Sequence, residues 1–446
     1  MRVFPEIRTF CVVLCHVSSC TFRTDKRSLC FISFFLLPLI FSLNIPLLCR
    51  ILCKMQHCYN KKYFFLLFFI SGLLFSPKNS LAESPIYGID VLKGLEYEPL
   101  EWRRTAVFCN QSSLDKEGRH LLDVLNPSDQ IVIPLIYIFN APQWKGLSIP
   151  EETIWMDSTV IRYQQYPYLR FHIRDILSVD AILFDMQLSG IVDDPALTIL
   201  QIAASLAQKH DLELIVCDRP PLTRVDTCQG PWHKGFELPY QYGLTSGELA
   251  HYFGTYFFPG LHLSIIPMDI RNRQDIPYLT SPYPVKVDTL LLHREQGKYI
   301  IGLSLLQATN LHIETTPENL WFGSPSADPF FLKAKLADIH PAFGNISIRT
   351  IKNDTTAFQI LSLDKVKLPE FYKITACLRL MFILYPDQVL LDTQALARKT
   401  GSHEYGNLLI SHAPLDHFQV YWEPEYRTFY ERMKRTSLYK SETQKE

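Results

Sequence analysis

Two short apolar runs, each ending in an aspartate, form the strongest pattern along this chain. Val179–Phe184 leads into Asp185, and Leu212–Cys217 leads into Asp218. Between them, Pro195–His210 repeats apolar side chains at helical spacing. Continuous apolar strands joined through a helix are typical of a parallel sheet covered on both faces. The pattern therefore places Asp185 and Asp218 together at the carboxyl edge of one sheet, where open sheets of this kind bind their ligands.

The alternation of strands and helices extends to both sides of this unit. Further strands are expected over Thr105–Cys109, Gln130–Phe139 and Leu261–Pro267. Further helices are expected over Lys116–Leu125, over Tyr168–Leu177 and from the capping residue Thr245 through Phe257. The pattern predicts the α/β class, with a five-stranded, doubly wound, Rossmann-like domain over residues 83–285.

The pattern changes beyond Ser281-Pro282-Tyr283-Pro284. Apolar strands near Thr289–Leu292, Ser347–Ile351 and Thr356–Leu363 now mix with helical patterns near Pro329–Ile339, Pro369–Tyr385 and Pro424–Tyr439. We expect a smaller α+β domain over residues 286–446.

The N-terminal region reads as a targeting segment. After Met55 come Lys61 and Lys62, then the apolar run Tyr63–Phe75, then small residues up to Ala82. This order is typical of a signal peptide, so residues 55–82 predict export to the periplasm with cleavage after Ala82. Residues 1–54 are then a non-native or membrane-associated extension. An anchor in the membrane through residues 30–52 is the alternative.

Charge and cysteine usage follow the same division. Residues 1–82 hold ten basic and two acidic side chains, whereas the remainder holds 34 basic and 43 acidic ones. An acidic body disfavours nucleic acid as a partner, because phosphate backbones require clustered Lys and Arg. Seven of the eleven cysteines precede residue 59, and no spacing resembles a metal site or a phosphate-binding loop. No cofactor and no metal are therefore expected.

A series of short motifs occurs in order along residues 85–440. The series is Tyr87-Gly88-Ile89-Asp90-Val91-Leu92, Asn110-Gln111, Gly118-Arg119-His120, Phe184-Asp185-Met186-Gln187, Asp218-Arg219-Pro220, Gly230-Pro231, Gly235-Phe236, Thr245-x-Gly247-Glu248-Leu249, Pro267-Met268, Ser281-Pro282, Asp288-Thr289, Gly323-Ser324-Pro325 and Leu384-Tyr385-Pro386-Asp387-Gln388. In this order the chain resembles the exo-β-N-acetylmuramidase family, which removes N-acetylmuramic acid from peptidoglycan fragments. The resemblance implies the same fold and a cell-wall amino-sugar glycan as the partner.

The chain departs from the family pattern where the resemblance implies catalytic groups. A Gly-Pro-Glu-His-Gly motif, whose Glu resembles a catalytic acid, corresponds to Asn140-Ala141-Pro142-Gln143-Trp144. An acid and an arginine are lost at Leu188 and Val192, a histidine is replaced by Tyr242, and a Glu-Gly-Thr-Asn segment appears as Ile301–Ser304. Because glycoside hydrolysis normally uses two carboxyl groups, this pattern suggests a degraded catalytic motif.

The candidate site residues all lie at predicted strand ends or in the loops that follow. Asp185 and Asp218 are the catalytic candidates, although an Asp at a strand end also commonly caps a helix or binds loop amides. The candidate substrate-binding residues are amides, aromatic side chains and one guanidinium: Asn110, Gln111, Gln143, Trp144, Gln187, Arg219, Tyr242 and Tyr283. Two hypotheses stay open: a glycosidase with a relocated acid, and a catalytically inactive protein that binds a glycan or a partner on the same scaffold.

Overall fold

The computed structural model describes residues 86–440, with gaps at 126–129, 141–158, 271, 277–284, 288–289, 293–297, 353–356, 412–413 and 416. Every element below belongs to one compact unit, Ser84–Glu446. None of the helices in the described residues is long and apolar enough to span a bilayer.

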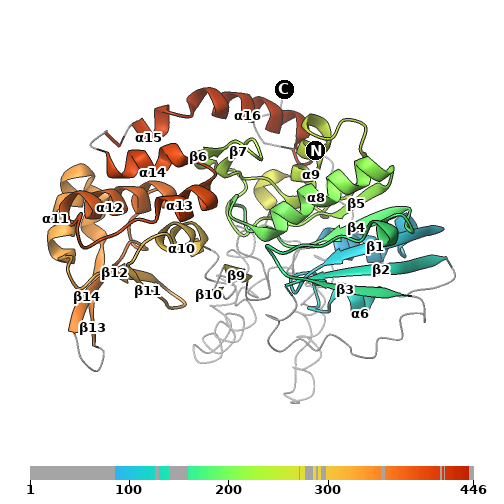
Figure 1. Cartoon of the computed structure of the whole chain (residues 1–446), viewed down its shortest axis with the longest axis horizontal. Helices are drawn as coiled ribbons and strands as arrows, with labels where there is room; N and C mark the ends of the chain where they lie inside the picture. Colours follow the sequence, from blue (N-terminus) through green and yellow to red (C-terminus); the bar gives the residue numbers. More distant parts are fainter. Residues whose placement is uncertain are drawn as a thin grey trace, which may run out of the picture. The chain divides into compact units, whose positions relative to one another are not determined.

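A parallel sheet forms the first half of this unit, which confirms the α/β class (Figure 1). Its strands follow the order β3-β2-β1-β4-β5-β8. Their bounds are β1 Arg103–Cys109, β2 Ile131–Phe139, β3 Val160–Gln164, β4 Ala181–Asp185, β5 Glu213–Cys217 and β8 His262–Ile266. The expected count of five strands is wrong, because the edge strand β3 was not anticipated. Its side chains are mostly exposed, so it lacks the continuous apolar run of the central strands.

Helices cover both faces of the sheet. These helices are α5 Gly88–Gly94, α6 Leu121–Val124, α7 Ile173–Ile176, α8 Pro195–His210 and α9 Ser246–Tyr256. On β1, Ala106 and Phe108 pack in the same apolar cluster as side chains of α8 and α9. Val107 and Cys109 point to the opposite face and pack with α5 and α6. The sheet is therefore doubly wound, as its continuous apolar strands indicate.

Two predicted helices are much shorter than expected. The segment Lys116–Leu125 is helical only over α6, because the Asp115 carboxylate accepts hydrogen bonds from the backbone N–H groups of Glu117 and Arg119 and holds a turn there. The segment Tyr168–Leu177 is helical only over α7. Upstream of α7, the backbone N–H of Arg170 donates to Gln164 Oε1 and that of His172 donates to the Tyr137 hydroxyl. Tertiary contacts thus replace the helical hydrogen bonds.

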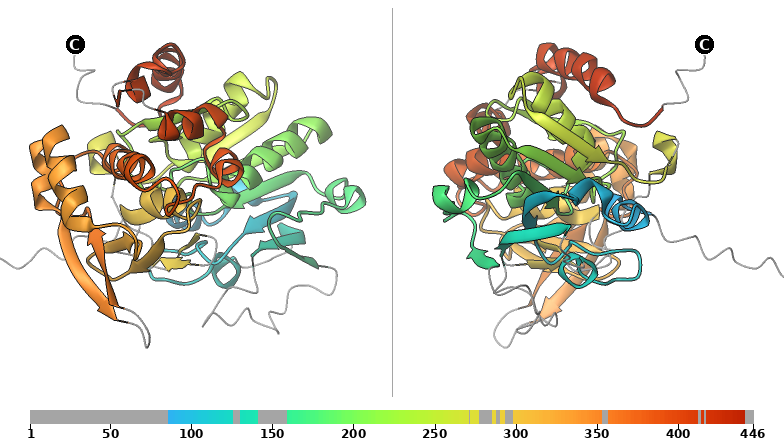
Figure 2. Two further views of the ribbon diagram at one scale, coloured as in Figure 1. Left: turned by 60° about the vertical axis from the view of Figure 1, so that its left-hand side comes forward. Right: turned by 90° about the vertical axis from the view of Figure 1, so that its right-hand side faces the viewer.

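The second half of the unit is built on an antiparallel sheet of order β11-β12-β14-β13, separate from the parallel sheet (Figure 2). Its strands are β11 His312–Thr315, β12 Leu320–Gly323, β13 Ser347–Lys352 and β14 Ala357–Ser362. Its helices are α10 Ile300–Leu306, α11 Pro329–Ile339, α12 Glu370–Leu384, α13 Thr393–Thr400, α14 His403–Ile410, α15 His417–Val420 and α16 Glu423–Thr436. Two short hairpins, β6 Gln229–His233 with β7 Leu238–Gln241 and β9 Val285–Val287 with β10 Leu290–Leu292, complete the strands.

The end of the described chain returns to the parallel sheet. Helix α16 packs beside α9, and the residues after it lie along the first half of the unit (Figure 1). The predicted helix through Tyr439 is wrong in its last turn, since α16 ends at Thr436. The Leu438 N–H donates to the buried Glu248 carboxylate at 3.2 Å, and the Arg273 N–H donates to the Lys440 carbonyl at 2.9 Å. These long-range bonds hold the last residues in an extended conformation.

Candidate functional site

The order of the strands narrows the position of the candidate site along the carboxyl edge of the sheet. From β1 the chain continues to β2 and β3 on one side, and then to β4, β5 and β8 on the other. The switch point therefore lies between the carboxyl ends of β1 and β4, where doubly wound sheets bind ligands. Asn110 follows β1, and Asp185 ends β4. Both were predicted at this edge, and the topology makes them neighbours across the switch point.

Asp185 and Arg219 form a buried ion pair at this point. The guanidinium donates to both carboxylate oxygens, from Nε at 2.5 Å and from Nη2 at 2.8 Å, and both side chains are 0% exposed. Nη2 also donates to the Leu114 carbonyl at 2.9 Å, and the guanidinium carbon lies 5.2 Å from the centre of the Tyr87 ring. Arg219 thus joins β4, β5 and the loop after β1. In this conformation the carboxylate of Asp185 faces Arg219 and has no exposed surface.

Asp218 is also fully buried, at the end of β5. Its carboxylate accepts hydrogen bonds from the Gly247 N–H at 2.7 Å, the Thr245 hydroxyl at 3.1 Å and the Ser246 hydroxyl at 3.2 Å. The Tyr439 hydroxyl donates to the same carboxylate from the end of the chain. Burial raises the pKa of Asp218 to about 6, although the Tyr439 hydroxyl and the Gly247 N–H oppose the shift. The geometry is that of a carboxylate anchoring the start of α9.

The raised pKa of Asp218 predicts a pH dependence of stability. Between pH about 4 and about 6 the folded chain holds a proton that the unfolded chain releases, so the free energy of unfolding falls as pH rises through this window. A shift of this size corresponds to about 3 kcal/mol. We expect urea unfolding of Asp218→Asn to show a flatter pH profile than the wild type. Parallel profiles for the two proteins would contradict the prediction.

The predicted amide side chains mostly serve the loop itself. Asn110 Oδ1 accepts hydrogen bonds from the N–H and the hydroxyl of Ser112, at 2.9 and 2.5 Å. The side chain of Gln187 donates to the Pro220 carbonyl, and its backbone N–H donates to the Ser112 hydroxyl at 2.8 Å. Asn110 and Gln111 are half-buried, whereas Gln187 is buried. Among the predicted site residues that the structure describes, only Asn110 and Gln111 therefore present surface to solvent.

Two buried polar atoms at the switch point lack a hydrogen-bond partner within the described part of the chain. They are Nη1 of Arg219, a donor, and Oε1 of Gln187, an acceptor. Gln187 bonds the carbonyl of Pro220, the residue next to Arg219, so both orphan groups lie where β4 and β5 end. Orphan groups of this kind are rare in folded proteins and often mark a bound water or ligand.

The positions at which the resemblance implies charged or polar groups are apolar and packed. Leu188, Val192, Tyr242 and Ile301 are all buried members of one hydrophobic cluster. Burial raises the pKa of Tyr242 well above its ordinary value. Gln143, Trp144 and Tyr283 lie outside the described residues, so their placement stays a prediction.

Several residues that organise this edge were not anticipated. Tyr439 binds Asp218 across 221 positions of the sequence, and no local pattern could have indicated that contact. Arg273 pairs with Glu248, which closes a capping box with Thr245 at the start of α9. Glu248 was expected at a helix start, and the structure places it there.

Three acidic side chains gather beside the switch point. Carboxylate oxygens of Asp90, Asp115 and Glu117 lie within 4.8 Å of one another. Lys93 and Arg119 form ion pairs with two of these carboxylates, at 2.6 to 3.7 Å. Local cations therefore balance the cluster, and its geometry alone assigns it no metal.

The comparisons with known proteins agree with the fold. Residues 105–284, which hold all six strands of the parallel sheet except the first two residues of β1, match the family model described as "Exo-beta-N-acetylmuramidase NamZ, N-terminal". Two crystal structures of DUF1343 family proteins from Bacteroides fragilis NCTC 9343 are similar in fold. One has a TM-score of 0.66 at 17% identity, covering 80% of this chain and 100% of its own. The other has a TM-score of 0.58 at 16% identity, covering 80% and 99%. No curated protein matches the chain. Residues 105–284 are therefore similar to the N-terminal region of the exo-β-N-acetylmuramidase NamZ family, and the similar solved structures share the fold of the described chain.

Proposed function

We propose that this protein has a muramidase-related function and takes peptidoglycan fragments that carry N-acetylmuramic acid. The family match over the residues that build the parallel sheet carries the proposal. The sugar would bind at the switch point between β1 and β4, beside Asn110 and Gln111. Amide groups suit hydroxyl and acetamido groups, because they donate and accept hydrogen bonds at once. Gln143, Trp144 and Tyr283 are proposed to contribute from their loops, and export through residues 55–82 would bring the protein to this substrate.

Hydrolysis is the first candidate reaction at this site. It requires one carboxyl group to protonate the leaving oxygen and a second to stabilise, attack or activate water. Asp185 and Asp218 are the proposed pair. Burial has already raised the pKa of Asp218 to about 6, the direction that a proton donor needs. Both carboxylates are 0% exposed, so the chain would have to open at this edge for either to reach a sugar.

Glycan binding without hydrolysis is the second candidate, and one observation favours it. Hydrogen bonds from Arg219 occupy both oxygens of Asp185, and hydroxyl and amide donors surround Asp218. Neither carboxylate therefore needs a substrate to explain its position. A binding protein would keep the polar loop after β1 and use no proton donor.

The experiment incubates the full-length protein with a chromogenic N-acetylmuramide and with muramic acid-terminated peptidoglycan fragments. Release of N-acetylmuramic acid that falls by about 10²–10⁴ in Asp185→Asn or Asp218→Asn supports the glycosidase. Urea unfolding of each variant must show that it remains folded under the assay conditions. Saturable binding without release, lost in Trp144→Ala, supports the binding protein. If the wild type neither releases nor binds the sugar, the proposed function is wrong.

A further inference from the structure

A carboxylate on the loop between β4 and α8 differs from the two proposed catalytic aspartates. The side chain of Asp193 is 25% exposed, whereas Asp185 and Asp218 are 0% exposed. Asp193 directly follows Val192, the buried residue at the position where the resemblance implies an arginine. The loop therefore brings a negative charge that solvent can reach to the carboxyl side of the parallel sheet.

Two residues of the antiparallel half hold one oxygen of this carboxylate. Oδ2 of Asp193 accepts a hydrogen bond from the Ser304 hydroxyl on α10 at 2.6 Å and from Lys399 Nζ on α13 at 3.0 Å. Lys399 also donates to Gln307 Oε1 at 3.1 Å. Helix α13 contacts both α10 and β6, so these groups lie on elements that pack together (Figure 1). The carboxylate is therefore fixed where the two halves of the unit meet.

The other oxygen of the same carboxylate is available. Oδ1 of Asp193 accepts no hydrogen bond from any residue that the structure describes. The Tyr240 hydroxyl, which is buried close to it, also lacks a hydrogen-bond partner among the described residues. Burial, together with the charge of Asp193, raises the pKa of Tyr240 well above its ordinary value, so the phenol keeps its proton. Polar groups left without partners in this way often mark a bound water or ligand.

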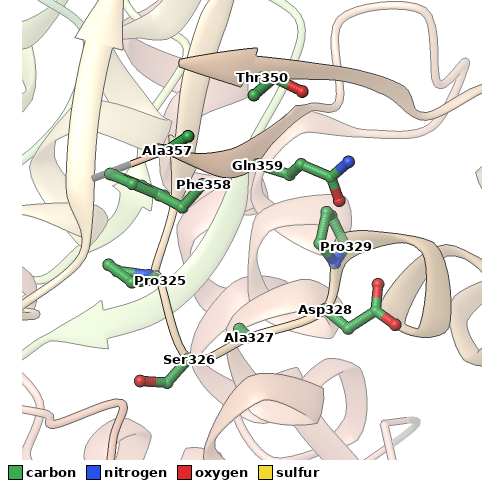
Figure 3. Close-up of a pocket in the computed structure, with 9 residues that line it drawn as sticks. All are labelled: Pro325, Ser326, Ala327, Asp328, Pro329, Thr350, Ala357, Phe358 and Gln359. Carbon is green, nitrogen blue, oxygen red and sulfur yellow. The ribbon is translucent and has the colours of Figure 1, made fainter. Parts of the chain in front are cut away.

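An ion pair that only joins the two halves explains part of this arrangement. Such a pair accounts for Oδ2, but not for the open Oδ1 or for the unpaired hydroxyl of Tyr240. Because Lys399 already balances the charge of Asp193, a neutral donor such as a hydroxyl group suits Oδ1 better than a second cation. None of these residues lines the open hollow beside α11 that Figure 3 shows, so the two places are separate.

We propose that Asp193 is a ligand-binding carboxylate, whose Oδ1 accepts a hydrogen bond from a hydroxyl group of the sugar. The choice of a sugar rests on the proposed function, whereas the open oxygen is a feature of the structure itself. Ser304 and Lys399 are positioning residues, because they hold Oδ2 and thereby fix the direction of Oδ1. An acceptor that is already held in place loses little conformational freedom when the ligand binds, which favours affinity.

The test titrates a thioglycoside of N-acetylmuramic acid, which resists hydrolysis, into the full-length protein by calorimetry. Asp193→Asn is expected to weaken binding about ten- to hundredfold, because it removes the charge from the accepting group. Glu404→Gln is the matched control, since it makes the same change in another lysine ion pair, with Lys234 at 3.3 Å, and should leave the affinity unchanged. Urea unfolding confirms that each variant is folded under the binding conditions.

Two deoxy analogues of the thioglycoside separate a ligand contact from a structural role. One analogue lacks the free ring hydroxyl, and the other lacks the exocyclic hydroxyl. The wild type is expected to bind one of them about tenfold more weakly than the parent sugar, whereas Asp193→Asn binds that analogue and the parent equally. Lys399→Met removes the ion pair but keeps the carboxylate, so it should retain the preference for the parent sugar.

The outcomes distinguish this proposal from the proposed function. If the wild type does not bind the parent sugar, both are wrong. If the wild type binds it and folded Asp193→Asn binds it equally well, the proposed function stands and Asp193 serves only the ion pair. The same conclusion follows if the wild type and Asp193→Asn show equal preferences among the parent sugar and the two analogues.

Discussion

Replacing Arg219 by alanine is expected to lower the free energy of unfolding by about 3–5 kcal/mol, as measured by urea unfolding. The substitution leaves the Asp185 carboxylate buried without its partner, at 0% exposure. It also removes the donor that joins the Leu114 carbonyl to this edge, so the loop after β1 loses its connection to β5. The cost comes from an uncompensated charge that is buried away from bulk solvent.

The matched control is Arg103→Ala, which removes the partner of Glu213 in an ion pair that is partly exposed. Such pairs contribute about 0–1 kcal/mol, so little loss is expected. Replacing both members of the buried pair, as Arg219→Met with Asp185→Leu, should restore much of the stability lost in Arg219→Ala. A loss below about 1 kcal/mol in Arg219→Ala would contradict the assignment of a buried ion pair.

Truncating Tyr439 to alanine is expected to cost about 3–5 kcal/mol in the same measurement. The ring is 5% exposed and packs in the cluster beneath α5 and α6. Its hydroxyl donates to Asp218 and accepts from the Met268 N–H at 2.9 Å. The substitution therefore creates a cavity and removes a donor from a buried carboxylate.

Tyr439→Phe separates these two effects, since it keeps the ring and removes only the hydroxyl. A hydrogen bond to a charged group contributes about 1.5–3 kcal/mol, so an intermediate loss is expected at neutral pH. The hydroxyl lowers the pKa of Asp218, so its removal should raise that pKa further. The window in which the free energy of unfolding falls with pH should then extend to higher pH. Tyr168→Ala, at a side chain that is 80% exposed, is the control and should change stability by less than about 0.5 kcal/mol. If Tyr439→Ala behaves like this control, the contact with Asp218 does not hold the end of the chain.

The predicted elements that the structure confirms are those with strong local patterns. Helix α8 has the bounds that its spacing indicates, from Pro195 to His210, and its N-cap Asp194 accepts from the Ala196 N–H. The strand that ends at Asp185 is buried throughout, and the strand before Asp218 is buried from Leu214 to Cys217. In such segments the apolar periodicity, and for the helix also the N-cap residue, favour the same secondary structure that the folded protein adopts. In contrast, β3 and the hairpin β6–β7 carry mixed patterns, and neighbouring strands stabilise them rather than their own composition.

The candidate site divides in the same way. The ends of the apolar runs in the sequence predict Asn110, Gln187 and Arg219 at one edge of the sheet. In the structure, hydrogen bonds connect each of the three to the loop after β1. Their hydrogen-bond partners could not be read from the sequence, because a carboxylate at a strand end has the same local pattern whether it faces solvent or a guanidinium. The catalytic role of Asp185 and Asp218 stays a prediction.

Local patterns are sufficient to predict the parallel sheet and its carboxyl edge, because continuous apolar strands are a local property of the chain. The pairing of Arg219 with Asp185 and the hydrogen bond from Tyr439 to Asp218 become apparent only in the folded chain. Each contact joins residues that are far apart in the sequence. Which side chains surround a buried carboxylate, and therefore stabilise its charge, depends on how the whole chain folds.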